Sequence, residues 1–457
     1  VTVCADWARA EDPITFGLEG ETPDRLTLYR VADARHDPKE AARVGGIILS
    51  LLALLTSGLV LLGLIATPLL INLIAPGFEG EKRDSVTTLV RILFPGMGLL
   101  VISAFCLGVL NSHRRFFISY AAPVIWNGAM IGALWYFRDS SGYQFAEYLA
   151  WGAVLGSFLQ LLVQVPFMLA YIRGMRPGFE TKSPTIRMIL KRFFPNLLAR
   201  GILQINAYIE SMIASYLPTG AVSAISYAQL LNTLPTSLFG TAVAASSLVD
   251  MSMANQEQEI GKKIHQSMRH IAFFIIPSAT AFVVMGNVLI ATILKTGKFQ
   301  DNDTMYVWTL LATSSLGLLA STQSRLFSST FYALKDATTP LRCSIVRVVA
   351  STCGAFIFSL GLPRLIDVHQ FVAAAGIPFA TGLAAFLEYA LLRKALMRLV
   401  AFDGLPLGFV TKLALAAGIS GILGSLAYQL QHSMPLSDLI RGGVAIIAFG
   451  VSYGSLP

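Results

Sequence analysis

Long runs of apolar residues recur along the whole 457-residue chain, and they restrict its possible folds more than any other feature. A run of about 18 or more apolar residues is long enough to cross the hydrocarbon core of a bilayer as a helix. Composition agrees, because only 13% of the residues are charged, whereas soluble proteins carry about 25%. These observations exclude a soluble enzyme and predict an all-α polytopic membrane protein.

Twelve apolar segments predict about twelve transmembrane helices, each sufficient for about 30 Å of hydrocarbon at 1.5 Å per residue. Prolines inside them, such as Pro68, Pro123 and Pro235, are expected to kink these helices rather than end them. The twelve segments lie at residues 45–75, 89–110, 116–137, 147–172, 193–216, 221–248, 270–294, 305–333, 341–361, 370–392, 406–429 and 439–455.

Basic residues gather on one side of this arrangement. The net charge of +8 is explained by the positive charge that collects in cytoplasmic loops, and it does not require nucleic-acid binding. The loops after even-numbered segments hold sixteen Lys and Arg residues, against six in the opposite loops. We therefore expect the even-numbered loops and both termini to be cytoplasmic.

Residues 1–40 differ from the rest of the chain. They hold fourteen charged residues and no apolar run that could cross a bilayer, and no signal peptide is visible in them. We interpret them as a charged non-membrane segment without a function of its own. The four cysteines form no C-x-x-C pair and no metal-ligand spacing, so neither a disulfide nor a metal site is expected.

An internal repeat relates the two halves of the chain. Residues 61–78 resemble residues 283–299, and residues 109–123 resemble residues 330–340, both at an offset of about 220. Six spans separate the copies, so both copies point the same way through the membrane, as in a parallel-repeat transporter. Spans 5 and 6 have no counterparts in the first half, so we expect a first lobe that lacks two helices.

The resulting division has five parts. It comprises a charged segment, an N-lobe of four spans, a basic cytoplasmic linker, a C-lobe of six spans and a C-terminal helix pair. These parts occupy residues 1–40, 41–175, 176–192, 193–398 and 399–457, respectively.

Polar residues enter the membrane mainly in the fifth and sixth spans. In each span they fall on one side of the helix at 100° per residue, which is typical of a helix that lines a water-filled cavity. The alternative is that their amides hold neighbouring helices together by hydrogen bonds. The residues that we expect to line a substrate cavity are Arg200, Gln204, Asn206, Glu210, Gln229 and Asn232.

Other intramembrane charges give weaker signals. Arg325 and Glu388 are placed near the cytoplasmic ends of their spans, where we expect their side chains to reach water. Arg200 is then the only intramembrane cation well placed for an anionic substrate. No nucleophile, Walker or metalloprotease motif occurs, so catalytic residues, metals and cofactors are not expected.

The stretch PNLLARGILQINAYIESMIASYLPTGAVSAISYAQLL (195–231), followed by LPTSLFG (234–240), resembles the lipid II flippases called MviN or MurJ. These belong to the multidrug, oligosaccharidyl-lipid and polysaccharide exporter superfamily. Further support comes from LNSHRRF (110–116), TGKF (296–299) and FYALKDATTP (331–340). The resemblance implies two lobes and a final helix pair, and alternating access that carries an undecaprenyl-pyrophosphate-linked peptidoglycan precursor across the bacterial inner membrane. Membrane lipids are the other expected partners.

The chain departs from the family pattern at its expected substrate site. The resemblance implies an arginine for the lipid's pyrophosphate at the position of Leu230, and it places the family's first two helices before residue 41. It also implies that Glu210 takes part in coupling to sodium ions or protons, with Ser351 and Ala355 at the positions of other cation ligands. We therefore expect the chain as written not to replace a lipid II flippase.

Two other functions stay open at this point. One is export of a drug or of a polysaccharide-linked lipid by a related transporter. The other is a non-transporting scaffold for cell-wall synthesis. Arginines in a coding segment upstream of residue 1 would favour the flippase, and their absence would favour the scaffold.

Overall fold

The structure is a computed structural model of the chain. It describes residues 38–112, 115–172, 175, 177–179, 186–187, 204–218, 220–252, 257–297, 299–334, 336, 338–365, 370–431 and 438–455. All regular structure within these ranges is helical. The predicted all-α class is therefore confirmed. The described chain divides into two compact units, with the boundary between Gln204 and Ile205.

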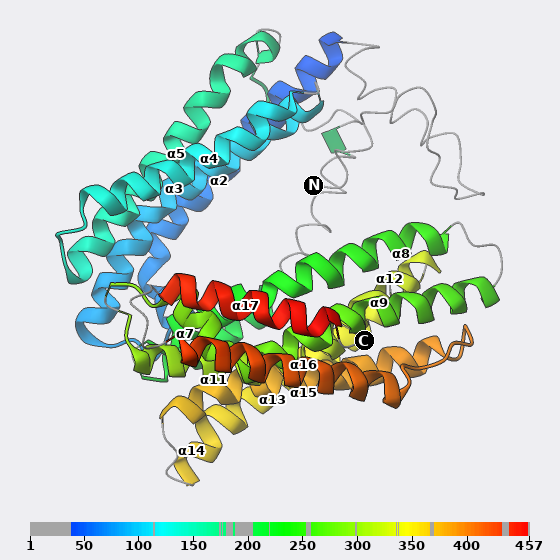
Figure 1. The fold of residues 1–457 in the computed structure, drawn as a ribbon. Coiled ribbons are helices and arrows are strands. Elements are labelled where there is room, and N and C mark those ends of the chain that lie inside the picture. The colour runs from blue at the N-terminus through cyan, green and yellow to red at the C-terminus, as the bar shows by residue number, and fades with distance from the viewer. Residues whose placement is uncertain are drawn as a thin grey trace. The chain divides into compact units, whose positions relative to one another are not determined.

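The first unit contains four long helices at the predicted positions of spans 1 to 4 (Figure 1). Pro68 and Pro123 lie inside uninterrupted helices, as expected. The helices are α2 (Pro38–Ile74), α3 (Gly80–Ser112), α4 (Phe116–Tyr136) and α5 (Gly142–Ile172).

Helix α5 packs against both α3 and α4 within this unit. Between α3 and α5, the Ser103 hydroxyl donates a hydrogen bond to Gln164 Oε1 at 2.9 Å, and Gln160 Nε2 donates to Ser103 Oγ at 2.9 Å. All three side chains are buried. Hydrogen bonds between polar side chains hold helices together where lipid supplies no partner, so this triad fixes α3 against α5.

The second unit begins at Ile205, inside a helical segment that ends at residue 215, and continues through the rest of the described chain. Its helices again follow the predicted spans. They are α7 (Ala221–Pro235), α8 (Ala242–Ser252), α9 (Glu257–Val284), α10 (Gly286–Leu294), α11 (Asp301–Ser315), α12 (Leu318–Ala333), α13 (Thr338–Phe356), α14 (Leu362–Leu365), α15 (Gln370–Leu396), α16 (Leu407–Leu430) and α17 (Asp438–Ser455).

Several predicted spans are broken rather than continuous. Pro235 is followed by a π-helical turn, η3 (Thr236–Thr241), and a second π turn, η4 (Ile357–Gly361), follows α13. Helices α11 and α12 meet at a 44° bend. At this bend Gly317 lies against Gly382 of α15, so that a Cβ on Gly317 would collide with the facing backbone. The bend therefore depends on two glycines at one close approach.

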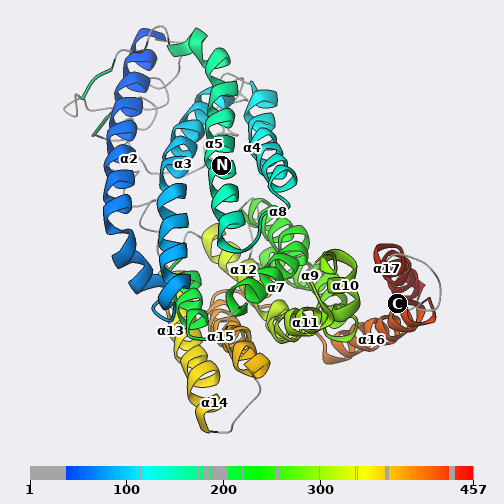
Figure 2. The ribbon, with the colours of Figure 1, turned by 90° about the vertical axis from the view of Figure 1, so that its left-hand side faces the viewer.

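The core of the second unit lies among α9, α11, α12 and α15. Ile264, Met268, Phe327 and Phe331 are fully buried there. Figure 2 shows α16 and α17 as a neighbouring pair. This pair packs on the core through contacts of α16 with α9 and of α17 with α10.

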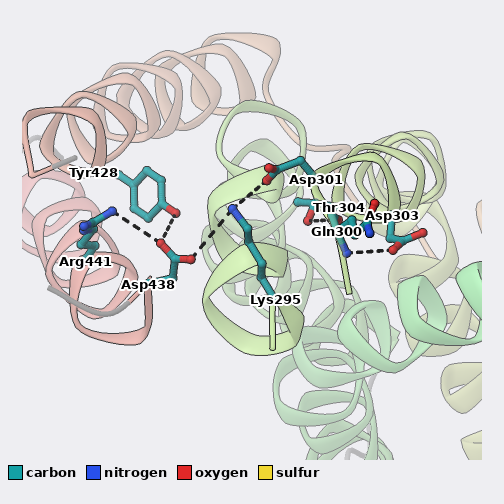
Figure 3. Close-up of polar contacts among 8 residues, drawn as sticks. All are labelled: Lys295, Gln300, Asp301, Asp303, Thr304, Tyr428, Asp438 and Arg441. Atoms are coloured by element: carbon teal, nitrogen blue, oxygen red, sulfur yellow. Dashed lines mark hydrogen bonds and ion pairs between the residues drawn. The ribbon is translucent and has the colours of Figure 1, made fainter. Parts of the chain in front are cut away.

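Polar contacts fasten the beginning of α17 to the turn between α10 and α11 (Figure 3). Asp438 accepts a hydrogen bond from the Tyr428 hydroxyl at 3.2 Å and lies 3.7 Å from Arg441 Nη1. Lys295 Nζ lies 2.7 Å from Asp301 and 4.0 Å from Asp438. The hydrogen bond that Lys295 donates to Asp301 and the charges of the two carboxylates raise the pKa of Lys295. Lys295 therefore joins α11 to α17.

Eight described helices are long and apolar enough to cross a membrane, or nine if the bent pair of α11 and α12 counts as one span. These helices establish a multi-span membrane protein. The larger number of twelve stays a prediction, because the shorter and broken helices do not meet this criterion singly. The predicted division into five parts also stays a prediction.

Candidate functional site

A cluster of hydrogen-bonded polar side chains surrounds Glu210 inside the second unit. Glu210 Oε1 accepts hydrogen bonds from Asn206 Nδ2 at 2.8 Å and from Thr381 Oγ1 at 2.9 Å. Glu210 Oε2 accepts one from Gln229 Nε2 at 3.2 Å. Ser351 Oγ donates to Asn206 Oδ1 at 2.8 Å. One carboxylate thus connects helical residues 204–215 with α7 and α15, and Asn206 extends the cluster to α13.

The helical register explains why these residues meet. Asn206 and Glu210 are four positions apart, so they lie one above the other on one face of the helix. That face carries the polar residues that predicted a half-polar span. The expectation that Asn206, Glu210 and Gln229 occupy one polar region agrees with this geometry. Whether they contact a substrate stays a prediction.

The remaining predicted cavity residues have different positions. Gln204 is exposed at the start of the helical segment. Asn232 is half-buried on α7, and its Oδ1 atom has no hydrogen-bond partner among the described residues. Arg200 lies outside the described residues. The Leu230 side chain is 62% exposed, so it stands outside the core of this unit.

A second group of charges lies on the same helices. Arg347 Nη1 of α13 donates to Glu388 Oε2 of α15 at 2.8 Å, and Ser344 Oγ donates to Glu388 Oε1 at 2.9 Å. Glu388 is only 4% exposed. The expectation that this carboxylate reaches water at the end of its span is therefore wrong. An arginine and a serine on the neighbouring helix replace water as its partners.

Arg325 of α12 lies close to this pair. Its Nη1 atom donates to Thr241 Oγ1 at the end of the π turn η3, at 3.2 Å. The charges of Arg347 and Glu388 both act on the Arg325 guanidinium. Arg347 is thus paired with the buried Glu388 carboxylate and Arg325 lies near this pair, so the three residues together have a net charge of about +1 when all are ionised.

The three charged residues lie at a similar depth. Arg325 lies eight positions before the end of α12, and Glu388 lies eight positions before the end of α15. Arg347 lies nine positions after the beginning of α13. At 1.5 Å per residue these positions are about 12–14 Å from the helix ends. Arg325 is exposed and also donates to Thr241, so the expectation that its side chain reaches water stays a prediction.

The two groups form one continuous polar surface. On α13, Ser351 follows Arg347 by four positions, and on α15, Glu388 follows Thr381 by seven. Each spacing places the two residues of its helix on one helix face. The Arg347 charge also acts on Glu210. We call the residues Glu210, Asn206, Gln229, Ser351, Thr381, Arg325, Arg347 and Glu388 the polar seam.

The sequence interpretation missed Arg347, which is a further cation inside a predicted span. The role expected for Arg200 stays a prediction, because Arg200 lies outside the described residues. The signal was present, since Arg347 stands inside the apolar segment 341–361 and three positions after Ser344. What the sequence does not contain is the pairing of α13 with Glu388 of α15. No group of three or more potential metal-binding His, Cys, Asp or Glu side chains occurs within the described ranges.

The sequence also matches the model of a known protein family. The family model "Lipid II flippase MurJ" matches residues 26–441. The chain belongs to the lipid II flippase MurJ family. Residues 26–441 cover both described units, so the family assignment applies to nearly all of the described chain.

Individual relatives carry the same name. The probable lipid II flippase MurJ of Rhizobium meliloti is 29% identical over 444 residues, which cover 90% of this chain and 79% of that protein. The lipid II flippase MurJ of Burkholderia cenocepacia is 26% identical over 389 residues, which cover 82% and 73%, respectively.

Solved structures place the fold in the same group. A lipid II flippase MurJ in an inward closed conformation has a TM-score of 0.72 at 20% identity, with 94% of this chain and 86% of that chain covered. An inward-facing multidrug-resistance MATE transporter has a TM-score of 0.65 at 17% identity, with 82% and 85% covered. At these identities the likeness shows a shared fold, and the MurJ structure is the better match of the two.

Proposed function

We propose that this MurJ-family chain is a transporter that moves a lipid-linked peptidoglycan precursor between the leaflets of the bacterial inner membrane by alternating access. The observation that carries the proposal is the pair of arginines, Arg325 and Arg347, which lie about 12–14 Å from the ends of their helices. Arg347 is bonded to the buried Glu388 carboxylate, and Arg325 lies near it. The relatives named as lipid II flippases support the choice of cargo.

The charge on these arginines fits a cargo with an undecaprenyl pyrophosphate carrier. A diphosphate that leaves water needs donors that replace its hydration, and guanidinium groups bind phosphate oxygens through paired N–H donors. Within the described residues, Nη1 is the only nitrogen of Arg347 with a hydrogen bond. Its other N–H groups are therefore available to a phosphate. Each such bond to a charged group contributes about 1.5–3 kcal/mol.

Glu388 keeps these arginines in place before the cargo binds. Two unpaired cations at this depth would repel each other and strongly oppose insertion into the membrane. Glu388 offsets one of these two charges. The polar seam, which also contains Glu210, has an excess of positive charge that attracts an anion when Glu210 holds a proton or a cation. The resemblance implied an arginine for the pyrophosphate at the position of Leu230. Its absence does not by itself prevent activity, because Arg325 and Arg347 supply cations from two other helices.

The same proposal assigns ion coupling to Glu210. Its carboxylate, Asn206 Oδ1 and the hydroxyls of Ser351 and Thr381 are oxygen atoms, the donors that hard cations prefer. A single carboxylate balances one monovalent charge, so a sodium ion or a proton fits this site. The described side chains hydrogen-bond one another here, and a bound cation would exchange some of these bonds for coordination. Ala355 offers no side-chain oxygen to such a cation.

Growth of a flippase-depleted bacterium tests the proposal. The chain is expressed in that strain, and its insertion into the membrane is checked by immunoblot. We expect restored growth, loss of growth with Arg325→Gln combined with Arg347→Gln, and full growth with Arg342→Gln, which removes an exposed cation of α13. An inserted chain that does not restore growth would contradict the proposal. Growth that persists in the double variant would show that transport does not depend on Arg325 and Arg347.

A further inference from the structure

A groove with a basic wall lies at the end of the second unit where α9 meets the segment between α15 and α16. Its volume is about 760 Å³. Cationic, histidine and aromatic side chains dominate its lining, together with one carboxylate. The residues used below are Lys262, His265, Arg269, His270, Phe273, Asp403 and Phe409. None of them belongs to the polar seam.

The basic wall is a stripe on one face of α9. At 100° per residue, Lys262, His265, Arg269 and His270 fall within an arc of about 140°. Phe273 lies within the same arc, one turn further along the helix. The stripe therefore changes from cationic to aromatic as the helix proceeds.

This change coincides with the start of the apolar part of α9. From Ile271 to Val284 the helix contains no charged residue, and Phe409 lies two positions after the start of α16. Aromatic side chains gather where helices enter the hydrocarbon region, and basic side chains gather just outside it. The groove therefore lies at the level of the phospholipid head groups.

Several contacts hold the groove in shape. The Arg269 guanidinium lies over the Phe409 ring, 4.8 Å from its centroid, which fixes this cation over an apolar surface. His265 Nδ1 is 3.1 Å from the backbone carbonyl oxygen of Asp403. A Cβ on Gly261 would collide with the Ala401 carbonyl, so glycine permits α9 to pack closely on this segment. These contacts within the protein hold α9 and the segment between α15 and α16 in place, and no ligand is needed for this.

We propose that this groove binds the phosphodiester head group of an acidic phospholipid, with an acyl chain along Phe273 and Phe409. Lys262 and Arg269 would contact the phosphate, and basic pockets beside membrane helices are suited to such head groups. The charge balance favours an anion, since two permanent cations face the single carboxylate of Asp403. Asp403 belongs to the segment between α15 and α16, which forms the other wall of the groove.

Native mass spectrometry of the purified chain tests the proposal. The protein in detergent is titrated with phosphatidylglycerol, phosphatidylethanolamine or phosphatidylcholine of identical acyl chains, and bound lipid is counted. We expect phosphatidylglycerol to be retained most strongly. Lys262→Gln and Arg269→Gln should each weaken its retention by about tenfold, because a charge-assisted hydrogen bond is lost. Arg342→Gln removes a cation outside the groove and should leave retention unchanged.

Three results would overturn the proposal. The first is equal retention of the three lipids, and the second is an equal loss of phosphatidylglycerol in Arg342→Gln. The third is preferential retention of phosphatidylethanolamine that Asp403→Asn abolishes, because the loop carboxylate would then select the head group. Lys262 is exposed, so its variant tests binding even if Arg269→Gln impairs folding. Displacement of the lipid by excess inorganic phosphate would assign the site to free phosphate instead.

Discussion

Glu388 is the residue on which the charge balance of the polar seam depends. It is 4% exposed, and its two oxygens accept hydrogen bonds from Arg347 and Ser344. A buried ion pair is not by itself strongly stabilising, because both charges lose water when they are buried. Removal of one partner is nevertheless costly, because it leaves the other charge without compensation.

A double-mutant cycle measures this dependence. Glu388→Gln should lower the free energy of unfolding by about 2–3 kcal/mol, less than the full value for a buried pair because the Arg347 side chain is 30% exposed and can recover water. Arg347→Gln should also be destabilising, and the double variant should cost less than the sum of the two single variants. Unfolding in mixed micelles is the measurement.

The pair of Lys263 and Glu259, with an N–O distance of 3.1 Å and a Glu259 side chain that is 52% exposed, provides the control. Glu259→Gln should cost under about 1 kcal/mol, because exposed ion pairs contribute little. Equal costs for Glu388→Gln and Glu259→Gln, or strict additivity in the cycle, would show that Glu388 does not compensate Arg347.

Among the elements, α17 approaches α10 closely through a glycine. A Cβ at Gly442 would collide with the side chain of Thr292, whereas a Cβ at the neighbouring Gly443 would meet nothing within 4 Å. Small residues let membrane helices approach closely. The packing of the C-terminal helix pair therefore depends on one of two adjacent glycines.

This pair of glycines gives a matched test. Gly442→Ala should destabilise the contact between α10 and α17 by about 1–3 kcal/mol, as overpacking does, and Gly443→Ala should have almost no effect. Hydrogen exchange of the α17 amides reports the difference. Similar exchange in the two variants would contradict the close packing of α17 on α10.

At the start of α13, Asp336 accepts hydrogen bonds from the backbone N–H groups and the hydroxyls of Thr338 and Thr339. These donors favour the ionised form and lower the pKa of Asp336 from 3.8 to about 2. A lowered pKa means that the stabilising contribution is present above pH 3.8. It is lost as the pH falls from 3.8 to about 2.

Asp336→Asn should therefore lower the melting temperature at neutral pH, and the difference from the unmodified chain should shrink through this acid range. Thermal melts of both proteins across the range are the measurement. Asp139→Asn, which changes a carboxylate that is 93% exposed and lies outside α13, serves as the comparison. A difference that stays constant down to about pH 2 would show that the Asp336 carboxylate does not cap α13.

The sequence predicted the positions of the helices well, because an apolar run of span length has few alternatives in a membrane. It did not predict the breaks inside them. The bend between α11 and α12 depends on contact with Gly382, which lies more than sixty residues away. The polar seam was predicted in part, since Asn206, Glu210 and Gln229 carry a helical period. Arg347 was missed because its pairing with Glu388 is a tertiary contact.

For the whole molecule, the sixteen-to-six distribution of basic residues still determines the expected orientation. Single cysteines are placed in a background without the native cysteines and labelled in intact cells with an impermeant thiol reagent. The loops at 111–116, 173–192 and 393–404 should stay unlabelled, because they are expected to be cytoplasmic. A cysteine at 79–86 should be labelled. The opposite pattern would reverse the orientation.

The π turn η3 also affects how related chains are aligned. The Thr241 hydroxyl donates to the Thr236 carbonyl, five positions back, and such a turn holds one residue more than an α-helical turn. A homologue with an unbroken α-helix here should need a one-residue gap. Without that gap, every alignment column after it shifts by about 100° around the helix. Thr241, the partner of Arg325 at the end of this turn, would then be aligned with the wrong residue of the homologue.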